Sequence, residues 1–126
     1  MSRPPEFEGP HFTIQALALA DGTCPAGDFL DALDSNDRRK LDVLFERLAD
    51  IGKISNVEKF KEVEGSDDVW EFKSIQIRLF CFVAPRRRVM LAFGVRKKRN
   101  KHRREDIDRA EAYRQQFLAR ERSAPR

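Results

Sequence analysis

The run Ile75-Gln76-Ile77-Arg78-Leu79-Phe80-Cys81-Phe82-Val83-Ala84 decides the fold of this chain. Successive side chains of a strand point to opposite faces, so this run would place apolar groups on both faces of a sheet. A strand that is apolar on both faces is typical of the interior of a sheet. We therefore expect residues 75–84 to form an internal strand, with Arg78 as its one charged residue.

Two β-like runs flank this strand, residues 69–73 before it and residues 89–95 after it. Pro85 and the arginines at 86–88 are typical of a turn. Residues 75–84 and 89–95 are therefore predicted to form an antiparallel hairpin. Three strands so close in sequence indicate a meander at the centre of the fold.

The upstream half contains one strand and two helices by the same reasoning. Residues 11–20 alternate as a strand does, and residues 25–33 form a short predicted helix. An apolar stripe predicts a longer helix over 36–51, with Ser35 as its N-cap and Gly52 as its C-terminal stop. The stripe consists of Leu41, Leu44, Phe45, Leu48 and Ile51.

The end of the chain adds one more helix, predicted over about 104–120, while residues 53–65 look mostly irregular. The order is then β-α-α-β-β-β-α. We expect an α+β fold with a small antiparallel-rich sheet and helices packed on one face. With 126 residues, the chain suits one domain over 11–120, a flexible lead-in over 1–10 and a flexible tail over 121–126.

Composition excludes several classes of protein. No apolar run of 18 residues is present, which argues against a membrane span, and the charged, proline-rich N-terminus does not resemble a signal peptide. Cys24 and Cys81 lack CxxC partners, and the only histidines are His11 and His102. We therefore expect free thiols, no metal and no other cofactor, and a reducing, cytoplasmic location.

Positive charge is concentrated in one part of the chain. Residues 86–104 carry ten lysines and arginines with no acid, whereas residues 1–85 carry ten against sixteen acids. Such a block attracts a polyanion to one place, although it does not by itself distinguish RNA, DNA or a membrane surface. A solvated charge run is the alternative.

Three groups within the second half are candidates for chemistry. Arg78 would be costly to bury unpaired, so it forms either a structural ion pair with Glu71 or a phosphate clamp. His102 has a pKa suited to acid–base work, although a lone loop histidine is more often a surface residue. The arginines at 86–88 are expected to be exposed contacts to a nucleic-acid backbone.

Several short motifs carry a family resemblance. In sequence order they are Trp70-Glu71-Phe72-Lys73, Ile77-Arg78-Leu79-Phe80, Gly94-Val95-Arg96-Lys97-Lys98, and Asp106-Ile107 with Ala110. Together they resemble the toxins of the RelE/ParE superfamily, in particular its phage-derived, HigB-like branch. The resemblance implies that Arg78 matches the family's strand arginine, that Lys73 stands at a second arginine position, and that Lys97 and Lys98 match a lysine pair.

The resemblance implies the toxin of a type II toxin–antitoxin system that inhibits growth by metal-free cleavage of mRNA on the ribosome. Attack by the RNA 2′-hydroxyl needs charge stabilisation and acid–base groups, for which we predict Arg78, Lys98 and His102. The predicted RNA-binding residues are Lys73, Arg86, Arg87, Arg88, Arg96, Lys97, Arg99 and Lys101.

The expected partners are mRNA, the ribosome and an acidic antitoxin, which would carry a DNA-binding domain and cover the basic groove. Two other functions stay open for the same fold. One is inhibition of DNA gyrase without cleavage, and the other is nucleic-acid binding with no chemistry.

Overall fold

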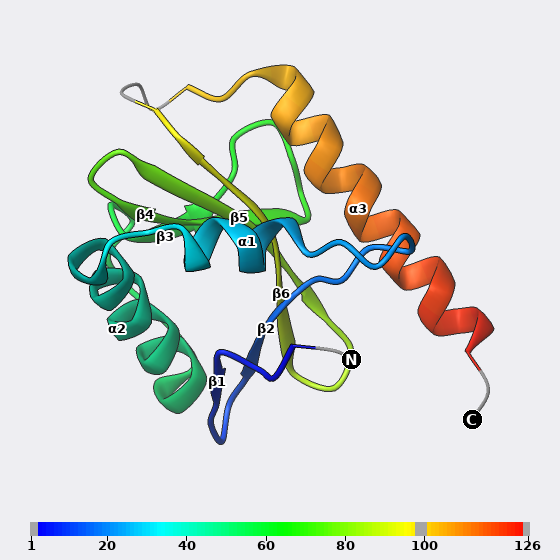
Figure 1. The fold of residues 1–126 in the computed structure, drawn as a ribbon, viewed down its shortest axis with the longest axis horizontal. Helices are drawn as coiled ribbons and strands as arrows, with labels where there is room; N and C mark the ends of the chain where they lie inside the picture. The colour runs from blue at the N-terminus through cyan, green and yellow to red at the C-terminus, as the bar shows by residue number, and fades with distance from the viewer. Residues whose placement is uncertain (1–2, 98–100, 125–126) are drawn as a thin grey trace.

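The computed structural model describes residues 3–97 and 101–124, and in these residues it has one sheet and three helices (Figure 1). The helices are α1 (Pro25–Asp31), α2 (Ser35–Ile51) and α3 (Arg104–Ser123). The strands are β1 (Phe7–Glu8), β2 (Thr13–Ala16), β3 (Phe60–Glu62), β4 (Val69–Ser74), β5 (Ile77–Ala84) and β6 (Arg88–Arg96).

The sheet is six-stranded in the order β1-β2-β6-β5-β4-β3, and it confirms the predicted α+β class. All neighbouring strands are antiparallel except β2 and β6, which run parallel. β5 is internal, between β4 and β6, and it forms the predicted hairpin with β6. A bulge in the β5–β6 ladder falls between Phe80 and Cys81.

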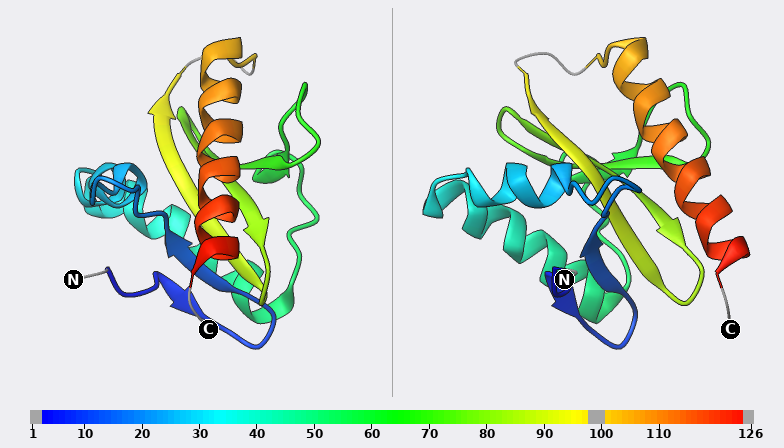
Figure 2. Two further views of the ribbon diagram at one scale, coloured as in Figure 1. Left: turned by 90° about the vertical axis from the view of Figure 1, so that its right-hand side faces the viewer. Right: turned by 45° about the vertical axis from the view of Figure 1, so that its right-hand side comes forward.

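Helices cover both faces of the sheet, which corrects the expectation of helices on one face (Figures 1 and 2). α1 and α2 pack on the face that carries Leu79 and Cys81 of β5. α3 packs on the opposite face, against Phe80 and Phe82. The physical reason is in β5 itself, because a strand with apolar groups on both faces must be covered on both.

Most predicted elements are confirmed with shifted ends. The helix after residue 34 is capped by Asp34 and not by Ser35, since the Asp34 carboxylate accepts a hydrogen bond of 2.8 Å from the Asp37 amide. Gly52 ends that helix in the left-handed conformation, as predicted. The strand expected over 11–20 is limited to β2. The region 53–65 contains the short strand β3, where Phe60 stacks on Trp70.

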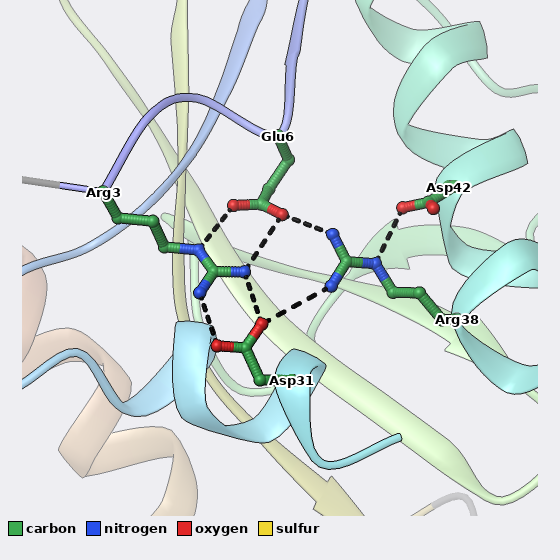
Figure 3. Close-up of polar contacts among 5 residues, drawn as sticks. All are labelled: Arg3, Glu6, Asp31, Arg38 and Asp42. Carbon is green, nitrogen blue, oxygen red and sulfur yellow. Dashed lines mark hydrogen bonds and ion pairs between the residues drawn. The ribbon is translucent and has the colours of Figure 1, made fainter. Parts of the chain in front are cut away.

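The N-terminal segment, expected to be a flexible lead-in, contains β1 and a network of ion pairs (Figure 3). Arg3 pairs with Glu6 and with Asp31 of α1, each at 2.8 Å. Arg38 of α2 contacts the same Glu6 carboxylate and also Asp42. The network therefore ties the segment before β1 to both helices of one layer.

This network makes stability depend on pH through Asp31. Its hydrogen bonds from Arg3 lower the pKa of the Asp31 carboxyl below the ordinary value. A lowered folded-state pKa adds stability above the unfolded pKa, and this stability is lost as pH falls through the folded pKa. We therefore expect Asp31→Asn to be less stable than the wild type at neutral pH, with a difference that shrinks as the pH falls below the ordinary pKa of an aspartate.

Urea unfolding across this pH range would measure the effect, with Asp67→Asn as the matched control. Asp67 is exposed and takes part in none of the ion pairs found among the described residues. If the difference in unfolding free energy between the wild type and Asp31→Asn stayed constant with pH, the Asp31 carboxylate would not be the source of the pH dependence.

The turn between β4 and β5 holds a strained residue. Ile75 has φ of 52° and is 67% exposed, although a β-branched side chain disfavours the left-handed region. Two hydrogen bonds brace the turn: Arg78 Nη1 donates to the Ile75 carbonyl at 2.7 Å, and the Lys97 amide donates to the Gln76 carbonyl at 2.7 Å. These bonds supply the tertiary support that such a conformation requires.

Replacing Ile75 by glycine is therefore expected to raise the free energy of unfolding by about 0.5–1 kcal/mol. The free energy gained by relieving the left-handed strain at residue 75 exceeds the free energy lost because glycine gives the unfolded chain more conformational entropy. Gln76→Gly is the matched control, because Gln76 is outside the left-handed region and should lose about 0.5–1 kcal/mol. Equal losses in both variants, measured by urea denaturation, would rule the strain out.

Candidate functional site

A buried polar network joins a carboxylate, an imidazole and an ammonium group. His102 Nε2 lies 2.7 Å from Glu71 Oε2, and its Nδ1 lies 2.9 Å from Lys97 Nζ. The side chains of Glu71 and His102 are 1% and 4% exposed. The carboxylate accepts a hydrogen bond from the Nε2–H group, which leaves Nδ1 to accept one from the Lys97 ammonium group.

Each member of the network comes from a different part of the fold. Glu71 is in the middle of β4, opposite Phe80 of β5 in the strand register. Lys97 directly follows β6. Because side chains alternate along a strand, it lies on the same face as Val95, which packs in the α3 layer. His102 precedes α3, and its ring packs against Phe80 with centroids 4.8 Å apart. The network thus exists only once β4, β6 and the start of α3 have assembled.

The network borders a cleft of about 600 Å³ between the β3–β4 region and the start of α3. Glu71 and His102 line the cleft from inside, and Ile107 adds an apolar wall. The other lining residues are Lys61, Glu64, Gly65, Lys101 and Arg104. Lys61, Lys101 and Arg104 face Glu64 and Glu71, so the lining has three cations and two acids, a small excess of positive charge that favours an anionic ligand.

Electrostatics distinguish the lysines of this region. Burial is the largest cause of a lowered pKa at Lys97, and the charges of Arg78 and Arg103 lower it further against the attraction of Asp106 and Glu71. A larger fraction of Lys97 is then a neutral amine near physiological pH than for an exposed lysine. Arg104, by contrast, is held by Asp108 at 2.9 Å and by the Gly65 carbonyl at 3.1 Å. Lys97 does not itself line the cleft, but it contacts His102, which does, and it is the cation of the network best suited to exchange a proton.

The contacts of Arg78 are with groups of the protein itself. Its side chain is 6% exposed, its Nη1 donates to the carbonyls of Ile75 and Ile77, and its Nε lies 3.7 Å from Glu71 Oε1. The predicted ion pair with Glu71 is confirmed. Arg78 does not line the cleft, and a role as phosphate clamp stays a prediction. Arg78 and His102 nevertheless meet at Glu71, so the strand arginine and the basic segment do converge.

The predicted basic residues do not all gather at this site. Lys98 and Arg99 lie outside the described residues. Lys101 lines the cleft, whereas Lys73 is buried beside it and pairs with Glu58 at 3.8 Å. Arg96 is on the wrong face for the expected groove, because its guanidinium turns towards α2 and pairs with Asp37 at 3.5 Å.

The arginines at 86–88 lie at the other end of the β5–β6 hairpin from Lys97 (Figure 1). Arg86 and Arg88 contact Glu121 of α3, and Arg87 donates to the Pro10 carbonyl at 3.2 Å. The single basic block of the sequence is therefore divided in two, and one part does not belong to the cleft.

Sequence reasoning missed two features of the site. It named His102 as an acid–base candidate, with a surface position as the alternative, but it did not foresee that Phe80 and the Glu71 carboxylate bury the ring. It assigned no role to Lys61, since β3 was not recognised. A charged residue in the middle of an apolar strand, such as Glu71, was the available signal for a buried partner.

Two searches of the described residues were negative. No group of three or more His, Cys, Asp or Glu side chains in them is placed to hold a metal ion. Residues 3–97 and 101–124 also contain no helix that is long and apolar enough to cross a membrane.

The mostly antiparallel sheet, with helices on both faces and a polar network at its edge, is consistent with the RelE-like class of α+β proteins. A model of the family described as phage-derived protein Gp49-like (DUF891) matches residues 28–115. The chain therefore belongs to the Gp49-like phage-derived family, which is a RelE/toxin-like family. A search of the curated proteins gave no match.

Proposed function

We propose that this protein is the toxin of a type II toxin–antitoxin pair, of the HigB-like branch, and that it cleaves mRNA without a metal ion. The observation that carries the proposal is the Glu71–His102–Lys97 network at the edge of a cleft that Lys61 and Lys101 line. A carboxylate that orients an imidazole, which in turn contacts a proton-exchanging group, is a recurrent arrangement in acid–base catalysis. Membership of a toxin-like family supports the same function.

In this proposal Lys97, as a neutral amine, takes the proton of the RNA 2′-hydroxyl. The 2′-oxygen attacks phosphorus, the bond to the 5′-oxygen breaks, and a 2′,3′-cyclic phosphate forms. The Lys97–His102 pair then returns the proton to the departing 5′-oxygen, which leaves as a hydroxyl. Lys61 and Lys101 in the cleft would stabilise the negative charge that develops on the phosphorane.

The test is to express the chain from an inducible promoter and map the 5′ ends of RNA during growth arrest. Cleavage predicts new ends bearing a 5′-hydroxyl, which a kinase labels without prior phosphatase treatment. Purified protein should produce the same ends when it is added to translating ribosomes. Growth arrest without such ends, together with inhibited supercoiling by purified gyrase, would instead establish the gyrase inhibitor.

A nucleic-acid-binding protein without chemistry is the second candidate. It is favoured by the engagement of both His102 ring nitrogens within the protein. This function predicts that RNA binding weakens steeply with salt while RNA length stays unchanged. Gel analysis of RNA after incubation with the purified chain separates the two candidates.

A further inference from the structure

Another hollow lies between α2 and the loop that follows it, away from the polar network of the candidate site. Its volume is about 360 Å³, and it shares no lining residue with the cleft described above. Its lining residues are Val43, Leu44, Arg47, Ile51, Lys53, Ile54, Ser55, Asn56 and Lys59. We refer to these nine residues as the α2 groove.

The α2 groove exposes apolar side chains that a solitary protein would normally cover. Val43 and Ile51 are 57% and 52% exposed, and Val57, in the same loop, is 61% exposed. Large apolar side chains that gather at one place on a surface usually mark a contact with another molecule. Val43, Arg47 and Ile51 are four residues apart, so they form one stripe along α2.

The charge of the α2 groove has one sign. Its lining contains Arg47, Lys53 and Lys59 and no Asp or Glu. None of the ion pairs found among the described residues involves these three cations, although eight arginines elsewhere in these residues have acidic partners. An apolar floor with a cationic rim complements an acidic, amphipathic segment of a partner.

We propose that the α2 groove binds an acidic amphipathic helix of a second protein, with apolar side chains of that helix packed between Val43 and Ile51. The inference rests on the proposed function, under which the second protein is the antitoxin. It moves the expected antitoxin contact from the basic segment before α3 to the other layer of the fold. The toxin could then be held by its antitoxin while the cleft stays open.

The test uses two synthetic helical peptides, one with leucines on one face and glutamates elsewhere, and one with lysines in place of the glutamates. Fluorescence anisotropy of labelled peptide with the purified full chain measures binding. We expect the acidic peptide to bind at least tenfold more tightly than the basic one. The double variant Arg47→Glu, Lys53→Glu should reverse this preference, and Val43→Asp should weaken both.

The matched control is Arg103→Glu, Arg122→Glu, which changes the same charge at exposed sites away from α2 and outside the groove. It should keep the preference for the acidic peptide. Equal binding of both peptides, or loss of the preference in the control variant, would overturn the inference. Peptide binding is independent of toxicity: growth arrest without peptide binding rejects the α2 groove alone, and peptide binding by a non-toxic chain rejects the proposed function alone.

Discussion

Lys97→Arg is expected to reduce RNA cleavage by about a hundredfold or more, although the substitution keeps the positive charge. The reason is that arginine does not lose its proton in proteins and so cannot act as a base. In the wild type, burial lowers the pKa of Lys97, which makes the neutral amine accessible. Cleavage should therefore rise with pH as Lys97 loses its proton, and this rise should be absent from Lys97→Arg.

Single-turnover cleavage of a labelled RNA by the purified chain would measure both effects. Lys101→Arg is the matched control, since Lys101 is an exposed cation of the same cleft and its proposed role requires only charge. It should keep most of the activity. Wild-type cleavage by Lys97→Arg would mean that Lys97 acts by charge alone, and the proton-transfer role would be excluded.

Glu71→Ala is expected to lower the free energy of unfolding by about 3–5 kcal/mol. Glu71 is the shared partner of His102 at 2.7 Å and of Arg78 at 3.7 Å, and all three side chains are buried. Without Glu71, His102 and Arg78 would stay buried without the carboxylate whose attraction offsets the cost of removing them from water. A loss of this size is a large fraction of the stability of a single domain.

Urea unfolding monitored by circular dichroism would measure this loss, and a variant that is unfolded without urea would also meet the expectation. Asp108→Ala is the control, because Asp108 is 59% exposed and its ion-pair partner Arg104 is 62% exposed. It should cost less than about 1 kcal/mol. Equal losses in the two variants would show that the Glu71 network contributes no more than a surface ion pair.

The local sequence determined the elements and their class. Alternation along residues 75–84 predicted an internal strand, and the apolar stripe before Gly52 predicted α2, because both signals depend only on the period of the backbone. β1 and β3 were missed because runs of two and three residues are too short to show a period. Their strand geometry comes from pairing with β2 and β4.

The candidate site required the tertiary structure. The basic block is continuous in sequence, yet the nine-residue strand β6 separates its two parts by roughly 25 Å, since a strand rises about 3.3 Å per residue. His102 was recognised as an acid–base candidate, but its burial was not, because Glu71 and Phe80 reach it from β4 and β5, far away in the sequence. The sequence by itself thus determined the three helices and the strands β4, β5 and β6, because their patterns depend on neighbours along the chain. Only the tertiary structure decided which charged groups meet, because distant segments pair according to the sheet order and not according to their charge.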